Sequence, residues 1–326
     1  MDTKEGPVVS FIMPAYKSRF LRKAIASILD QTFADFELVV VDDGSPENLA
    51  EIVSDFSDPR LEYYRYGDNL GGHDLIGAWN RAMKFARGTF TVLASDDDVY
   101  HPRYLAEMLS LAKKYPHVNL FHCRIAIIDE NGNVCKVGEK TPEYETCARM
   151  LYARGVARRI QRAAEFMFRT SGFNSAGGFV WMPRAWYSDD ATWFALSKCG
   201  GVACSPELLF MARDSSLNIC SCRTDVVEKL RAGELFRKWV HAFMETCKPV
   251  NETDMAYLKV AKNGIDREID RMGRWVLRHA PPRLAVRAIC SLDISWSQIV
   301  SLLFRMAFLG CRRNIRLDIE DGRQVS

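Results

Sequence analysis

The sequence lacks the short motifs that mark several common classes of ligand site. No G-x-G-x-x-G segment follows the first apolar run and no G-x-x-x-x-G-K-[ST] segment occurs anywhere, so the usual glycine-rich cradles for dinucleotides and nucleoside triphosphates are missing. The six histidines show no H-x-x-x-H or H-x-H spacing, which gives a histidine-based zinc site little support. The ten cysteines include no C-x-x-C pair, and we expect them to be reduced thiols, mostly in the core.

Signals for secretion and for membrane spanning are also weak. Residues 1–7 are polar and run straight into an apolar segment, so we expect no secretory signal and a cytoplasmic location. The apolar segment 294–311 contains Arg305 and is short for a bilayer, which makes it a poor spanning helix. At 326 residues, 48% hydrophobic and 26% charged, the chain can bury a sizeable core.

The net charge of +3 conceals an asymmetry along the chain. From Arg271 to Arg316 there are nine arginines and one acid, Asp293, so this part carries +8 and the remainder −5. This balance predicts an anionic partner for the C-terminal region, either membrane lipid or nucleic acid. A DNA- or RNA-binding role has weak support, because aromatic and basic residues do not interleave over a sustained stretch.

Residues 294–311 have an amphipathic pattern. Ser297, Ser301 and Arg305 share one helical stripe, and apolar residues occupy the other side. Such a helix can pack on the protein's own core or lie on a membrane surface. The arginines around it favour the membrane, so we expect peripheral attachment to an anionic surface, at the inner face of the cell membrane.

The first half of the chain alternates apolar runs with helical patterns. The apolar runs are expected to be strands at 8–13, 36–41, 61–66 and 91–94. Helices are expected between and after them, at 19–31, 47–56, 74–86 and 103–114. This order predicts an α/β fold with a doubly wound, mostly parallel sheet, whose ligand crevice lies at the carboxyl ends of the strands.

The second half has a looser pattern. Val118 to Ile128 is apolar and ends in a turn at 129–133, which predicts a hairpin and an antiparallel part of the sheet. Residues 146–168 are expected to be helical, and the glycines of 171–181 allow close approach of a ligand or a simple turn. Two long amphipathic helices are expected at 225–247 and 254–279, before Pro281 and Pro282 break the pattern.

Polar residues follow three of the expected strands. Pro14, Asp43 and Asp97 all lie at strand carboxyl ends, and Asp97 is the middle of three consecutive acids. Adjacent carboxylates repel one another unless they meet water, a cation or hydrogen-bond donors. One explanation is a solvated turn with a helix cap. The other is a divalent cation shared between carboxylates and the phosphates of a ligand.

Five segments of the first half resemble the ordered motifs of inverting family-2 glycosyltransferases with the GT-A fold. They are Pro14–Tyr16, Ser27–Phe33, Phe36–Ser45, Asn69–Gly72 and Ser95–Asp98. The resemblance covers residues 8 to about 130. It implies a GT-A domain over residues 1–222, with a nucleotide-sugar half at about 8–130 and an acceptor half at about 131–222. A helical extension over 223–326 would follow.

The resemblance also implies roles for individual residues. Pro14 and Tyr16 match the first strand end, where the aromatic ring packs against the nucleotide base. Asp43 matches the acid that accepts a hydrogen bond from the pyrimidine N–H, although Tyr16 could be an ordinary strand-end aromatic and Asp43 a helix N-cap. Asp96 matches the residue near the ribose or donor sugar, and Asp97 the acid that binds Mn²⁺ or Mg²⁺.

Two departures from the family pattern affect the acidic residues. Ser95 stands where the family usually has the first acid of its metal motif. The family also supplies its catalytic base from a Glu-Asp pair opening a helix, with an arginine six residues after the Asp. Glu207 has this spacing to Arg213, with Pro206 in place of the preceding acid, so we expect a helix start at Pro206 and Glu207 as the base. The alternatives to Glu207 are Asp189, Asp190 and Asp214.

The function implied by the resemblance is metal-dependent transfer of a sugar, with inversion, from a nucleotide-sugar to a saccharide or lipid-linked saccharide. A UDP-linked donor is expected, and surface polysaccharide or glycan biosynthesis is the expected setting. The departure at Pro206 and Glu207 keeps open an alternative, a non-catalytic nucleotide-sugar-binding or scaffolding subunit that has lost the base.

Overall fold

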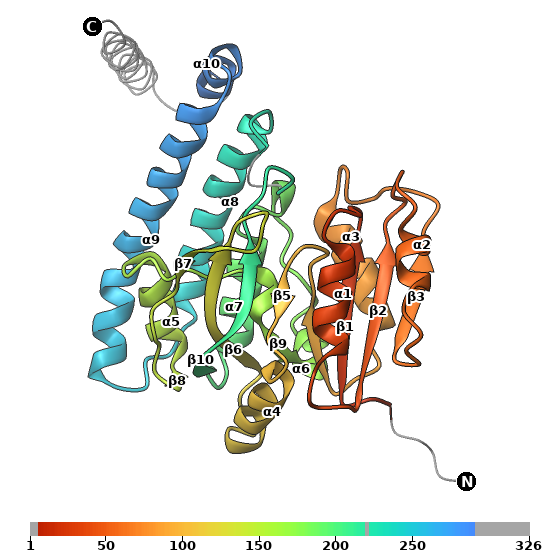
Figure 1. The fold of residues 1–326 in the computed structure, drawn as a ribbon. Helices are drawn as coiled ribbons and strands as arrows, with labels where there is room; N and C mark the ends of the chain where they lie inside the picture. Colours follow the sequence, from red (N-terminus) through yellow and green to blue (C-terminus); the bar gives the residue numbers. More distant parts are fainter. Residues whose placement is uncertain (1–5, 219–221, 291–326) are drawn as a thin grey trace, which may run out of the picture.

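The computed structural model describes residues 6–218 and 222–290, in which a ten-stranded sheet runs through the molecule (Figure 1). The main strand order is β3-β2-β1-β4-β9-β6-β10-β5, with β7 beside β6 and β8 beside β10. The first four strands are β1 (Val9–Ala15), β2 (Phe36–Asp42), β3 (Leu61–Arg65) and β4 (Phe90–Leu93). All pairings among them are parallel, as predicted from the alternating pattern.

The sheet becomes mixed beyond β4, as the predicted hairpin requires. The remaining strands are β5 (Val99–Tyr100), β6 (Leu120–Ile128), β7 (Val134–Val137), β8 (Tyr144–Glu145), β9 (Met167–Arg169) and β10 (Val202–Arg213). β6 and β7 form the hairpin, and β9 lies antiparallel between β4 and β6. β10 is parallel to β6 and antiparallel to β5 and β8.

Helices cover both faces of the sheet because successive strand residues point to opposite sides. On β1, Phe11 and Met13 belong to one buried cluster and Ile12 to the other. The first face packs against α1 (Leu21–Leu29), α2 (Leu49–Ser54) and α4 (Tyr104–Lys114). The second packs against α3 (Leu75–Ala82), α5 (Cys147–Gly155), α6 (Thr170–Ser175) and α7 (Ser188–Ser197). Short 3₁₀ turns lie at Met83–Phe85, Ala163–Glu165 and Pro183–Ala185.

Two expectations for the second half were wrong. The helix expected over 146–168 ends at Gly155, and the chain continues through a 3₁₀ turn into β9. The helix start expected at Pro206 is instead the middle of β10, where the register against β6 shifts between Ser205 and Leu208. Proline has no N–H to donate, so within a strand it is placed where the ladder is interrupted.

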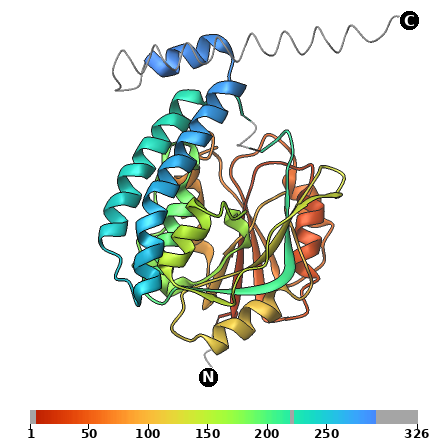
Figure 2. The same cartoon turned by 90° about the vertical axis from the view of Figure 1, so that its left-hand side faces the viewer.

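The two long helices expected at 225–247 and 254–279 are confirmed. α8 (Val226–Glu245) and α9 (Glu252–His279) lie side by side, α9 packs against α5, and α10 (Pro282–Cys290) follows (Figure 2). Asn251 caps α9 by accepting the N–H of Asp254 at 2.9 Å. Within residues 6–218 and 222–290, no helix combines the length and hydropathy needed to cross a bilayer. The amphipathic segment 294–311 lies outside the described residues.

The described cysteines form no disulfide. Cys123 and Cys204 are buried, whereas Cys135 and Cys199 are exposed, so the expectation of mostly core thiols holds only in part.

Candidate functional site

The carboxyl ends of β1, β2 and β4 meet at one edge of the sheet. Ala15 pairs with Asp42 in the parallel register, and the N–H of Asp43 donates to the Ala15 carbonyl at 3.1 Å. The N–H of Ala94 donates to the Ile12 carbonyl at 2.8 Å, which continues the ladder just before the three acids. The structure therefore brings Pro14, Tyr16, Asp43, Asp96 and Asp97 to the same edge.

Asp96 is bound to the segment that follows β1. Its Oδ2 accepts the backbone N–H groups of Tyr16 and Lys17, each at 2.9 Å. The Lys17 ammonium lies 3.5 Å from Asp96 Oδ1 and 3.3 Å from Asp97 Oδ2. Burial raises the pKa of Asp96, against the opposing effect of Lys17. Burial lowers the pKa of Lys17, but the two carboxylates outweigh it and the net change is upward.

Asp98 points away from Lys17 and towards the end of β10. Its Oδ1 accepts the N–H of Arg213 at 2.8 Å, and the Arg213 guanidinium donates to the backbone carbonyls of Asp97 and Asp129 at 2.9 and 2.8 Å. Burial, with the neighbouring Asp97, raises the pKa of Asp98 to about 8. Asp98 and Arg213 thus hold the acidic segment in place, whereas the Asp97 carboxylate faces Lys17.

Asp43 lies between a glycine turn and an arginine. Its Oδ2 accepts the N–H of Gly71 at 2.6 Å, and its Oδ1 pairs with Arg81, whose guanidinium also stacks 3.7 Å from the centre of the Tyr66 ring. A Cβ atom on Gly71 would lie only 2.8 Å from Asp43 Oδ2. Tyr16 is 39% exposed, so its ring face is open to a planar ligand.

The acids fit a divalent cation that is shared with a ligand. Among the described residues no group of three or more histidine, cysteine, aspartate or glutamate side chains could hold a metal ion. Asp97 Oδ2 nevertheless already faces a cation, the Lys17 ammonium. One carboxylate is enough when diphosphate oxygens and water complete the coordination of Mn²⁺ or Mg²⁺.

Glu207 does not join this cluster. It lies in the register shift of β10, is partly exposed, and forms an ion pair with Arg103 at the start of α4. Arg213, which contacts the acidic segment, is six residues further along the strand, or about 15–20 Å. The prediction of Glu207 as the base assumed that residues 207–213 form a helix. They lie in a strand instead, in which six residues extend further and separate the side chains of Glu207 and Arg213.

Asp189 and Asp190 open helix α7, in the manner expected of a base-bearing pair. Asp190 is buried and its Oδ1 accepts from Arg154 Nε at 2.8 Å and from Gln161 Nε2 at 2.6 Å. Asp189 is less buried, and burial together with Asp190 raises its pKa to about 6. The charge of Arg162 opposes the rise in the pKa of both Asp189 and Asp98.

The segment before α7 contacts both α3 and α7. The N–H of Phe179 donates to Asn80 on α3 at 3.0 Å, and the N–H of Val180 donates to Thr192 on α7 at 2.9 Å. Trp181 Nε1 donates to Asp74 at the start of α3 at 3.1 Å.

Asp214, the remaining alternative for the base, is exposed directly after β10.

Lys17 and Arg213 contact the acids, but the sequence analysis did not include Lys17 and considered Arg213 only as the arginine that follows Glu207. The sequence feature that could have indicated Lys17 is its position directly after Tyr16, and for Arg213 it is the spacing from Glu207.

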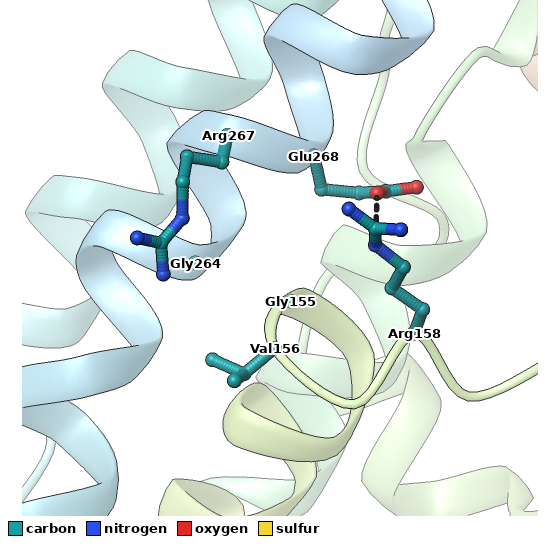
Figure 3. Close-up of a pocket in the computed structure, with 6 residues that line it drawn as sticks. All are labelled: Gly155, Val156, Arg158, Gly264, Arg267 and Glu268. Carbon is teal, nitrogen blue, oxygen red and sulfur yellow. Dashed lines mark ion pairs between the residues drawn. The ribbon is translucent and has the colours of Figure 1, made fainter.

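A separate pocket of about 340 Å³ lies between α5 and α9 and holds none of the expected site residues (Figure 3). It is lined by Gly155, Val156, Arg158, Gly264, Arg267 and Glu268.

Known proteins share both the sequence and the fold. Residues 10–187 match the family described as Glycosyl transferase family 2. UDP-Glc:alpha-D-GlcNAc-diphosphoundecaprenol beta-1,3-glucosyltransferase WfgD of Escherichia coli is 33% identical over 130 residues, 40% of this chain and 50% of that protein. An uncharacterized glycosyltransferase of Haemophilus influenzae is 24% identical over 277 residues, 81% of this chain and 77% of that protein. The chain spans about half the length of the first curated relatives that it matches.

Two solved structures share the fold at low sequence identity. S. aureus TarS 1-349 in complex with UDP-GlcNAc has a TM-score of 0.62 at 16% identity, covering 86% of this chain and 83% of TarS 1-349. The mannosyltransferase PcManGT from Pyrobaculum calidifontis, in complex with GDP-Man and Mn²⁺, has a TM-score of 0.56 at 16% identity, covering 96% of this chain and 83% of PcManGT. The GT-A fold expected from the sequence is confirmed, and the family match extends over more than half of the chain. The chain belongs to glycosyl transferase family 2.

Proposed function

We propose that this protein is an inverting, metal-dependent glycosyltransferase that moves a sugar from a UDP-linked donor to a saccharide or lipid-linked saccharide. The main support is the meeting of Asp43, Asp96 and Asp97 at one sheet edge. Family membership supports sugar transfer from a nucleotide-sugar. The name of WfgD includes UDP-Glc and a diphosphoundecaprenol-linked sugar, which supports both the donor nucleotide and a lipid-linked acceptor.

Each donor residue has a distinct role in this proposal. The exposed ring of Tyr16 stacks on the base, Asp43 accepts the pyrimidine N–H, and Asp96 orients the ribose or donor sugar. Asp97 would hold Mn²⁺ or Mg²⁺ together with the diphosphate. When bound, such a cation offsets the charge that develops on the departing diphosphate.

We assign the catalytic base to Asp189 in place of Glu207. Inversion requires a carboxylate that takes the acceptor hydroxyl proton on the face opposite the leaving diphosphate. Asp189 has no ion pair within the described residues, and its pKa of about 6 suits a base at neutral pH. Asp190 is held by Arg154 and Gln161, so it anchors the start of α7 and with it the position of Asp189.

A panel of nucleotide-sugars tests the donor site. We expect UDP-sugars to raise the Tm of the full chain more with Mn²⁺ than with a chelator, because a cation would offset the repulsion between carboxylate and diphosphate. Asp97→Asn should remove the metal effect, whereas Asp55→Asn on the surface should keep it. Equal stabilisation with chelator, with metal and in Asp97→Asn would refute the site. Slow release of UDP from a stabilising donor would separate an enzyme from a non-catalytic subunit.

A further inference from the structure

Lys17 makes contacts at the acidic edge that the proposed reaction has not used. Its side chain is 28% exposed and reaches across to an acidic segment eighty residues further along the chain, where the ammonium lies 3.3 Å from Asp97 Oδ2. Its backbone N–H is fixed on Asp96. The backbone contact therefore sets the position of the side chain, and only the flexible stem can move.

Lys17 is the sole cationic partner of the Asp97 carboxylate within residues 6–218 and 222–290. The other oxygen of Asp97 accepts the hydroxyl of Ser95. Arg213 contacts Asp97 only through the backbone carbonyl. The charge of the metal-binding acid is thus balanced by one lysine in the absence of ligand.

We propose that Lys17 is a resident cation that occupies Asp97 in the free protein, competes there with a divalent ion, and moves onto the donor diphosphate when the ion and donor bind. This rests on the proposed role of Asp97. A lysine suits the task because its charge is compact and its four-carbon stem has many rotamers. The exchange would make metal binding weak without a nucleotide and strong with one.

The experiment measures Mn²⁺ binding to the full chain without nucleotide, from the electron paramagnetic resonance signal of free Mn²⁺. Lys17→Met removes the charge and keeps most of the stem, so we expect Mn²⁺ to bind roughly tenfold more tightly or better. Lys17→Arg keeps a positive charge and should stay much closer to the parent protein. Lys23→Met, at an exposed position of α1, is the matched control and should change nothing.

A second measurement follows UDP binding by calorimetry with Mn²⁺ present. The proposal predicts that Lys17→Met weakens UDP binding severalfold while it strengthens Mn²⁺ binding alone, a pair of opposite effects that loss of folding cannot produce. Unchanged or weaker Mn²⁺ binding in Lys17→Met, with Asp97→Asn still abolishing it, would overturn the role of Lys17 and leave the metal site intact. If Asp97→Asn has no effect on Mn²⁺ binding in the Lys17→Met protein, the metal site itself fails, and this inference with it.

Discussion

Asp189 and Asp190 are neighbours in the sequence, but the fold gives them different surroundings. Consecutive residues of a helix point about 100° apart, so one acid of the pair faces α5 and the other does not. Asp190 is neutralised by Arg154 and receives a further hydrogen bond from Gln161. Asp189 lacks such partners among the described side chains, and its raised pKa reflects burial beside a second carboxylate. This difference is the reason for assigning proton transfer to Asp189.

Asp189→Asn should keep donor binding and lose transfer, by about 10²–10⁴ in rate, because an amide cannot accept the proton. A base must be ionised to act. Since its folded-state pKa is about 6, kcat/KM of the parent protein should rise between pH 5 and 7 and level off above. Initial rates across this pH range, with UDP affinity measured in parallel, test the assignment.

Glu207→Gln is the matched comparison for that variant. Glu207 pairs with Arg103 on the surface, so we expect nearly full transfer activity and an unchanged pH profile. Full activity in Asp189→Asn together with loss of transfer in Glu207→Gln would return the base to Glu207.

The turn between β3 and α3 holds the carboxylate of Asp43 in position. The N–H of Gly71 is bonded to Asp43 Oδ2, and no side chain fits between them. Gly71→Ala should push the carboxylate aside and weaken UDP binding by roughly tenfold, the effect of losing about one good hydrogen bond. Gly67→Ala lies in open space in the same turn and should bind as the parent protein does. Calorimetry measures the UDP affinity of both variants. Equal affinities would show that Asp43 does not contact the nucleotide.

Helix α9 contains two glycines with opposite expectations. A Cβ on Gly264 would overlap Val156 and lie 3.2 Å from the backbone of Gly155, so Gly264→Ala should destabilise the protein by about 1–3 kcal/mol through overpacking against α5. Gly273→Ala would make only ordinary contact with Leu230, at 3.4 Å. It should be neutral or stabilise the helix by up to about 1 kcal/mol. Urea unfolding gives the free energy of unfolding of the two variants. Similar changes in both would show that α5 and α9 do not pack this closely.

At the scale of the whole molecule, the basic C-terminal region remains the predicted membrane contact. α10 buries Ala285, Ala288 and Ile289 against the protein and exposes Arg283 and Arg287. Positive charge therefore lies on the outer face of α10, immediately before residue 291, where the described part of the chain ends. Exposed positive charge here favours attachment to an anionic surface, to which each basic residue contributes about 1 kcal/mol.

Liposome flotation tests the prediction for residues 294–311. The full chain should float with vesicles in proportion to their anionic lipid, and less at high salt, because both charge and the apolar face contribute. A chain truncated after Ser291 should float poorly. Equal, negligible flotation of both would place the segment on the protein's own core and would remove the main sequence support for membrane attachment.

The accuracy of the sequence predictions depended on how local their physical causes were. The first four strands and their helices were predicted correctly, because alternating apolar runs and turn residues act within a few positions. β10 was mistaken for a helix start at Pro206. Proline can open a helix or interrupt a strand, and the choice here depends on β6, about eighty residues earlier in the chain.

The sequence by itself determined which acids meet at one edge of the sheet, because parallel strands bring their carboxyl ends together and Asp43 and Asp97 each follow such a strand. Only the tertiary structure decided which side chains surround those acids. Lys17 reaches Asp97, Arg213 reaches Asp98, and Glu207 is carried away along an extended strand. Such contacts depend on the geometry of packed elements, which the spacing of residues along the chain does not contain.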